Sequence, residues 1–146
     1  KLDLSYTLSD LGVLETKRNR LAESLEFFDR ALRIRQQVFE ADKSNARARH
    51  ALVGVLARQG IVLDQMGRGQ QAEIMFRRAL TFGSAPDSAE CAYRLARLLH
   101  SRGRVREAQD YWQQARTLVN SETSALSPGA RNRVRTVAPW QGAADF

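Results

Sequence analysis

Cysteine and long apolar runs are both scarce in this chain of 146 residues. The single cysteine, Cys91, excludes an internal disulfide and any metal site built from several thiolates, and it favours a reducing compartment. We therefore expect a cytoplasmic protein. The longest apolar run is only a few residues, whereas a helix needs about 20 to span a bilayer, so we expect no membrane association. Lys1 is followed by no charged-then-apolar leader, which gives secretion no support and favours attachment to a larger multidomain chain.

Patterns of catalytic residues are missing as well. His50 and His100 are far apart in the sequence and form no His-Glu-x-x-His or other ligand pair. The glycine-containing stretch at 67–73, "GRGQQAE", lacks the lysine and hydroxyl of a phosphate-binding loop. Cys91 is expected to be a small packed side chain and His50 a helix-surface residue. We therefore expect no enzyme, no cofactor and no metal.

Acidic residues become scarce only in the later part of the chain. Residues 1–43 hold eight Lys/Arg and eight Asp/Glu, whereas residues 44–146 hold fifteen and eight, so the whole net charge of +7 lies after residue 43. Arginine accounts for 20 of the 23 basic residues. This preference has two explanations that the residues leave open: selection for fork-like recognition of carboxylate or phosphate, or a codon bias toward arginine.

Apolar residues recur every three or four positions, which predicts helices and no strand. They form three helical hairpins at about 3–41, 45–82 and 87–119, in which the polar or glycine-containing stretches "TKRNR", "MGRG" and "SRGR" separate the paired helices. Asp42 or Ser44 is predicted to cap the second pair, and Asp87 the third.

The pattern stops after residue 119, and residues 120–146 are predicted to be a loop, a short helix and a tail. Ser127 and Pro128 favour a helix start, so we expect a helix at about 128–137 that caps the stack. The last nine residues are expected to be mobile, although Trp140 and Phe146 would also suit docking into a groove, including one on a neighbouring chain.

The hairpins are copies of one another. When the sequence is aligned with itself at an offset of 48 residues, identical residues coincide at helical spacing in the first and second copies. An offset of 36 residues aligns the second copy with the third. The first offset pairs Leu4 with Leu52, Leu8 with Leu56, Gly12 with Gly60, Phe28 with Phe76, Ala31 with Ala79 and Leu32 with Leu80; the second pairs Ala72 with Ala108 and Ala79 with Ala115.

These residues resemble the tetratricopeptide repeat, with a Leu-Gly pair on the first helix and an Ala, aromatic, Ala series on the second. The copies match through Leu8, Leu11, Gly12, Leu21, Phe28 and Ala31, through Leu56, Gly60, Leu63, Gly67, Ala72, Phe76 and Ala79, and through Leu95, Ala96, Leu99, Gly103, Ala108, Trp112 and Ala115. Departures are Glu15, Ser24, Gln59 and Ala96. The resemblance implies an all-α fold, a right-handed α-solenoid of three hairpins over 1–119 with a C-terminal capping helix. The spacing of 48 residues between the first and second copies is similar to that of bacterial tandem repeats.

The repeat pattern predicts close helix packing. Gly12 and Gly60 let backbones approach, while Phe28, Phe76 and Trp112 fill the space between neighbouring hairpins. The arginines around Trp112, in the stretch "GRVREAQDYWQQAR", could indicate a nucleic-acid patch. We instead expect Trp112 to be mostly buried against the second helix of the preceding repeat, where it cannot stack on a base.

The resemblance also implies a concave groove lined by the first helix of each hairpin, in which a peptide of another protein binds. The residues expected to bind it are Tyr6, Lys17, Arg58, Ile61, Tyr93, Arg94, Arg97 and His100. Family members that hold a terminal carboxylate of chaperone tails use cationic and amide side chains at set places. Only Arg94 matches one of them, because Ser9, Val13, Arg58 and Glu90 fill the others. We therefore expect an acidic or amphipathic segment instead.

Two alternatives compete with this hypothesis. Arg58, Arg94 and Arg97 are either ligand-binding or paired in surface salt bridges with Asp64, Glu90 and Asp87. The basic later half could also contact nucleic acid or another polyanion. A continuous basic face formed by the arginines of 94–106 and 131–135 would favour phosphate, and their dispersal among carboxylates would favour a peptide.

Overall fold

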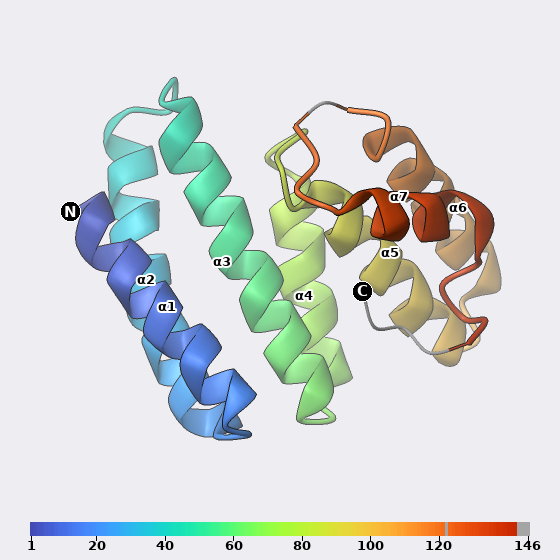
Figure 1. Cartoon of the computed structure of the whole chain (residues 1–146), viewed down its shortest axis with the longest axis horizontal. Helices are drawn as coiled ribbons and strands as arrows, with labels where there is room; N and C mark the ends of the chain where they lie inside the picture. Colours follow the sequence, from blue (N-terminus) through green and yellow to red (C-terminus); the bar gives the residue numbers. More distant parts are fainter. Residues whose placement is uncertain (122, 143–146) are drawn as a thin grey trace.

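A computed structural model describes residues 1–121 and 123–142 of the chain, which fold as an α-solenoid (Figure 1). Within these ranges there are seven helices and no strand. They are α1 (Leu2–Lys17), α2 (Leu21–Ala41), α3 (Ala46–Gln65), α4 (Gly69–Leu80), α5 (Ser88–Ser101), α6 (Val105–Leu118) and α7 (Pro128–Thr136). The predicted fold class is confirmed. None of the helices in the described part is both long and apolar enough to cross a membrane.

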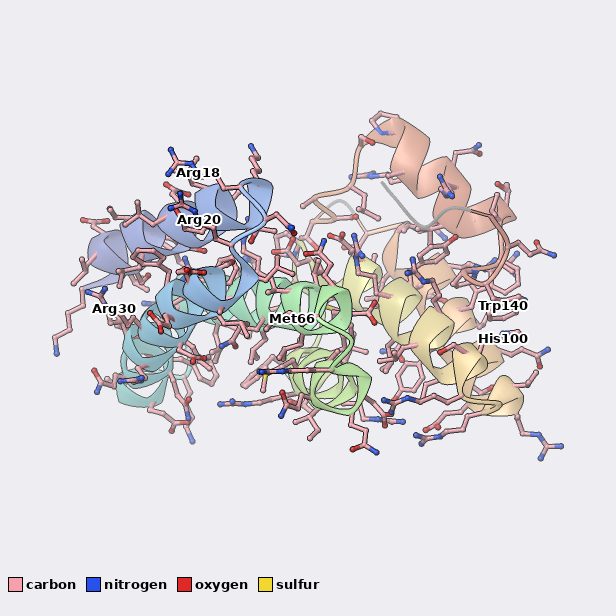
Figure 2. The ribbon with its side chains drawn as sticks, turned by 90° about the horizontal axis from the view of Figure 1, so that it is seen from below. Arg18, Arg20, Arg30, Met66, His100 and Trp140 are labelled. Carbon is pink, nitrogen blue, oxygen red and sulfur yellow. The ribbon has the colours of Figure 1, made fainter. Side chains whose placement is uncertain are left out.

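The hairpins follow one another along the long axis of the molecule, and α7 crosses the end formed by α5 and α6 (Figure 1). The two helices of each hairpin pack together, and the hairpins contact each other through α2 with α3 and α4 with α5. The first helices also touch, α1 with α3 and α3 with α5. Seen from below, α1 and α7 lie along the same side of the solenoid (Figure 2).

The same turn closes all three hairpins. One residue in each turn has a positive φ, and the N–H after it bonds to the carbonyl five positions earlier, as in a Schellman motif. The positive-φ residues are Asn19, Gly67 and Gly103, and the bonds run from Arg20 to Glu15, from Arg68 to Leu63 and from Arg104 to Leu99. Because residues with a Cβ rarely adopt this conformation, glycine or asparagine stands there in each copy.

An aromatic ring lies directly on a glycine in the first two hairpins. Phe28 and Phe76 are each 1% exposed. A Cβ added at Gly12 would lie 2.6 Å from Cε1 of Phe28, and one at Gly60 would lie 2.5 Å from Cε1 of Phe76. These contacts are too close for any side chain, so both glycines are required by packing.

The third hairpin departs from this arrangement. Ala96 stands where the other copies have glycine, so a Cβ is present at the position that the ring covers in them. Trp112 is partly buried and turns toward α7, where its Nε1 donates to the carbonyl oxygen of Val134 at 2.8 Å. Trp112 keeps most of its surface away from water, as predicted, but its cluster is formed mainly by α5, α6 and α7 and not by the second helix of the preceding repeat.

Two predicted caps also differ from the structure. Asn45 caps α3, because its side chain accepts from the N–H of Ala48, while Asp42 instead accepts from the N–H and hydroxyl of Ser44 in the preceding loop. Asp87 stands at the N-cap position of α5, but its carboxylate makes no capping hydrogen bond. At α7 the predicted helix start at Ser127 and Pro128 is confirmed, and the side chain of Ser127 accepts from the N–H of Ala130.

We expect the Gly60→Ala variant to lose about 1–3 kcal/mol of unfolding free energy, because the added methyl group forces the Phe76 ring out of a filled core. Chemical denaturation measures the loss. Gly129→Ala on α7 is the matched control, since nothing lies within 4 Å of a Cβ there. Equal stability of the two variants would contradict the ring-on-glycine packing.

Candidate functional site

Two adjoining clefts lie between the first helices of the first two hairpins. The first, called the apolar hollow below, has a volume of about 210 Å³. It is lined by Val13, Thr16, Lys17, Phe28, Arg58, Ile61 and Val62. Of the residues predicted to bind a ligand, Lys17, Arg58 and Ile61 thus meet at one place. Ile61 and Val13 provide its partly exposed apolar surface, and the two cations stand exposed beside it.

The second cleft, called the polar cleft, has a volume of about 240 Å³. It is lined by Tyr6, Ser9, Asp10, Arg35, His50, Ala51, Gly54, Arg58 and Asp87. Its walls therefore come from α1, α2, α3 and the start of α5. Tyr6, also predicted as a ligand residue, belongs to this cleft. Arg58 lines both clefts, so that they form one groove with an apolar part and a charged part.

Arg35, which the sequence did not single out, is the buried cation of the polar cleft. It is 3% exposed and donates from Nε to Ser5 Oγ (3.0 Å), from Nη1 to the carbonyl of Ala51 (2.7 Å) and from Nη2 to the carbonyl of Ser5 (3.3 Å). Its guanidinium also lies 4.9 Å from the centre of the Tyr6 ring. Burial lowers the pKa of Arg35, because removal from water disfavours the charged form.

The sequence did contain a signal for Arg35. Helix α2 buries Ser24, Phe28, Ala31, Arg35 and Phe39, so this arginine occupies a core position of the helical period. A cation in the middle of an apolar stripe indicates a buried polar function, since charged residues are seldom fully buried without a partner.

The charged groups around Arg35 are left without close partners. No carboxylate of the described residues comes within ion-pair distance, 4.0 Å, of Arg35 or of Arg58, and Asp10 and Asp87 form no ion pair in that part of the chain either. Burial raises the pKa of Asp87, against the attraction of Arg58 and Arg35. The competing hypothesis that pairs Arg58 with Asp64 or Asp87 is thus not what the structure shows.

The C-terminal segment covers the third part of the predicted groove. The Tyr93 hydroxyl donates to the carbonyl of Val137 at 2.8 Å, and the Trp140 ring stacks on His100 with centroids 4.3 Å apart and planes 8° from parallel (Figure 2). The edge of Trp112 meets the same indole at 5.7 Å. Tyr93 is only 2% exposed. In this conformation neither Tyr93 nor His100 offers its ring to a ligand.

The same contacts bear on the expectation that residues 138–146 are mobile. Ala138 and Pro139 are buried, and Trp140 packs against His100 of α5 and Trp112 of α6, whereas residues 143–146 lie outside the described part of the chain. Phe146, the other aromatic residue considered for docking, lies outside the described residues.

Arg94 and Arg97 lie on α5, away from the two clefts. Arg94 donates from Nε to Glu90 at 3.0 Å on its own helix, which agrees with the salt-bridge alternative. Arg97 is partly buried, and its charge acts on the hydroxyl of Tyr93. Neither of them lines the apolar hollow or the polar cleft, so the structure does not gather Arg58, Arg94 and Arg97 at one of these sites.

The arginines around 102–106 are interleaved with carboxylates. Glu73 accepts from Arg77, Arg102 and Arg104 at 2.9–3.1 Å, and Glu107 pairs with Arg77 and Arg104. Burial opposes ionisation of Glu73, but the bonds from Arg77 and Arg104 outweigh it, and the net result is a lowered pKa. This network links α4, α5 and α6 and does not present a bare cationic surface.

The remaining part of the predicted basic face is also engaged. Arg131 donates to the carbonyl oxygens of Leu126 and Ser124, and Arg135 donates to the side-chain oxygen of Asn120. Arg94, Arg102 and Arg104 are thus dispersed among carboxylates, the outcome that favours a peptide. The acceptors of Arg131 and Arg135, in contrast, are uncharged oxygens that leave the positive charges in place.

Comparison with known proteins agrees with the repeat pattern. A family model described as "Tetratricopeptide repeat" matches residues 3–85. No curated protein matches the chain. Among solved structures, the crystal structure of BtubC (BKLC) from P. vanneervenii is similar, with a TM-score of 0.68 and 17% sequence identity over 92% of this chain and 54% of that one. This chain therefore spans about half the length of that structure, and at such identity the likeness concerns the fold alone.

Acid should weaken the Glu73 network. A carboxylate with a lowered pKa stabilises the fold above its unfolded pKa, about 4.3, and loses that contribution as the pH falls through the folded value. We expect Glu73→Gln to cost about 1–2 kcal/mol at pH 7 and to show a smaller further loss than the wild type between pH 6 and pH 3. Denaturation across this pH range measures both. Parallel curves would contradict a role for the ionised carboxylate.

The Trp140 contacts can be tested through the other indole. Because the chain has two tryptophans, Trp140→Ala leaves only Trp112 to fluoresce. We expect its emission to move to longer wavelength and its quenching by iodide to increase several-fold as the C-terminal segment detaches. In Trp140→Phe the fluorescence again comes only from Trp112, and the ring should keep that indole protected. Identical quenching in both variants would show that the segment does not depend on this ring.

Proposed function

Because the chain belongs to the tetratricopeptide repeat family, whose repeats generally mediate protein–protein interactions, we propose that it is a scaffold that binds a peptide segment of another protein. The observation that carries this proposal is the junction of the apolar hollow and the polar cleft at Arg58, an exposed cation that forms no ion pair within the described residues. Such scaffolds are typically non-enzymatic, and we propose no catalytic activity here.

The chemistry of the groove favours an amphipathic segment with an acidic residue. An apolar side chain of the peptide would enter the hollow against Ile61 and Val13, where removing its surface from water stabilises the complex. A neighbouring carboxylate would then lie between Lys17 and Arg58. Arginine forks suit this task because they donate two parallel hydrogen bonds to a carboxylate.

The site proposed here is shorter than the groove that the sequence suggested. It uses Tyr6, Lys17, Arg58 and Ile61, which line the two clefts. A ligand that also reached Tyr93, Arg94, Arg97 and His100 would have to displace the C-terminal segment from Tyr93 and His100. We therefore propose that the partner binds across α1 and α3 and leaves that segment in place.

Nucleic acid is the less favoured ligand, because counterion release requires several cations free to neutralise phosphates. Arg94, Arg102 and Arg104 are each paired with glutamate, so these three cations are not free for phosphate. A cytoplasmic location remains part of the proposal, and the buried, unpaired thiol of Cys91 is compatible with it.

The proposal is tested with peptides selected from a random display library against the whole chain. We expect the selected sequences to combine an apolar and an acidic residue, and Arg58→Ala to weaken the best of them about 10- to 100-fold through loss of a charge-assisted bond. Ile61→Ala should weaken it as well, through lost apolar contact.

Arg30→Ala is the matched control, because Arg30 is exposed on α2 and lines neither cleft (Figure 2). Calorimetric titration of the three variants and the wild type gives the affinities. Unchanged affinity in both groove variants would place the binding surface elsewhere, and equal losses in all three would indicate a nonspecific charge effect.

A further inference from the structure

Gly54, on the floor of the polar cleft, differs from the glycines that packing requires. Whereas Cβ atoms at Gly12 and Gly60 would collide with aromatic rings, one at Gly54 would meet only Asp87 Oδ2 at 3.1 Å and Arg35 Nη1 at 4.0 Å. The atom to be displaced is the end of the Asp87 side chain, which makes no capping bond, and it would have to shift by only a few tenths of an ångström. Because a glycine within a helix is destabilising relative to alanine, Gly54 is not explained by packing as Gly12 and Gly60 are.

What Gly54 does provide is a bare stretch of helix backbone between opposite charges. Arg35 and Arg58 line the cleft with positive charge, and Asp10 and Asp87 line it with negative charge. His50 also lines it and accepts a hydrogen bond from Arg49 through Nε2 at 3.2 Å. The four charges are kept apart within one cavity of about 240 Å³, although direct pairing would have neutralised them.

We propose that the polar cleft binds an uncharged, planar carboxamide group of the peptide ligand, such as an asparagine or glutamine side chain. The inference rests on the proposed peptide-binding function and adds a specificity to it. The amide lies flat over Gly54, its oxygen accepts from the arginine side of the cleft, and its NH₂ group donates to Asp87 or Asp10. A carboxamide carries one acceptor and two donors, which matches walls of both signs.

Charged ligand groups fit this cleft less well. A carboxylate would approach Arg35 and Arg58 but would also face Asp10 and Asp87, and an ammonium group would meet the reverse arrangement. Buried charges without compensation are costly, whereas a neutral group that satisfies donors and acceptors at once brings no net charge into the cavity. The cleft therefore distinguishes glutamine from glutamate, which have the same shape.

The test uses the whole, isotope-labelled chain and two isosteric probes, N-acetyl-glutamine methylamide and N-acetyl-glutamate methylamide, at millimolar concentration. We expect the glutamine probe to shift the NMR signals of the Gly54 amide and Arg35 Nε saturably, and the glutamate probe to bind at least tenfold more weakly. In Gly54→Ala, which should melt no lower than the wild type, the added methyl group fills the floor and should reduce glutamine binding at least tenfold.

A second variant reverses the preference. Asp87→Asn keeps the shape of the side chain but gives the cleft a net positive charge, so the glutamate probe should become the better ligand. Tighter binding of glutamate by the wild type, the same probe preference in Asp87→Asn as in the wild type, or saturable glutamine binding that persists in Gly54→Ala would each overturn the inference, as would no shift with either probe.

The display-selected peptide separates this inference from the proposed function. If the selected peptide shifts the NMR signals of Ile61 but the glutamine probe leaves the Gly54 amide signal unchanged, the carboxamide inference fails and the proposed peptide binding stands. If the glutamine probe binds at Gly54 but no selected peptide shifts the NMR signals of Ile61, the proposed peptide-binding function fails instead.

Discussion

The buried guanidinium of Arg35 is the interaction on which the first two hairpins depend. It reaches from α2 to a backbone carbonyl of α1, at Ser5, and to one of α3, at Ala51, so a single side chain joins three helices. Carbonyl oxygens satisfy its donors but do not neutralise its charge, and burial makes that charge costly. The polar cleft follows from this constraint, because Asp10 and Asp87 supply negative charge near the guanidinium without closing on it.

The register of the hairpins is set by a second constraint, the contact of a ring with bare backbone. Gly60 and Phe76 show why the two residue types recur together at fixed spacing, since the ring fits only where no Cβ exists. The third copy differs by one methyl group, the side chain of Ala96. With Ala96 in the glycine position, Trp112 turns outward to α7 and creates the surface on which Trp140 docks. The covering of the last part of the groove thus occurs in the copy that departs from the glycine pattern.

The sequence predicted the helices and the fold well, because its local patterns recur: helical periodicity three times, and a turn glycine and the ring–glycine spacing twice each. It also predicted that Lys17, Arg58 and Ile61 lie near one another, since the family resemblance places them on the first helices. Residues on other elements could not be placed in this way. Arg35 belongs to α2 and Asp87 to the start of α5, and only the packing of three hairpins brings them to one cleft. The role of Trp140 likewise depends on the outward turn of another side chain, which periodicity does not encode.

The two halves of the groove consequently differ in how accessible they are to a partner. On α5, the chain's own C-terminal segment already bonds to Tyr93 and stacks on His100, and a tethered segment competes at a high effective concentration. A partner gains most by avoiding that competition. On α1 and α3 no segment of the described chain fills the clefts, and charged groups that the fold has left apart are available. In the binding mode proposed here, Arg58, exposed and common to both clefts, is where a peptide would meet apolar surface and unpaired charge together, and specificity would then be concentrated in the first two repeats.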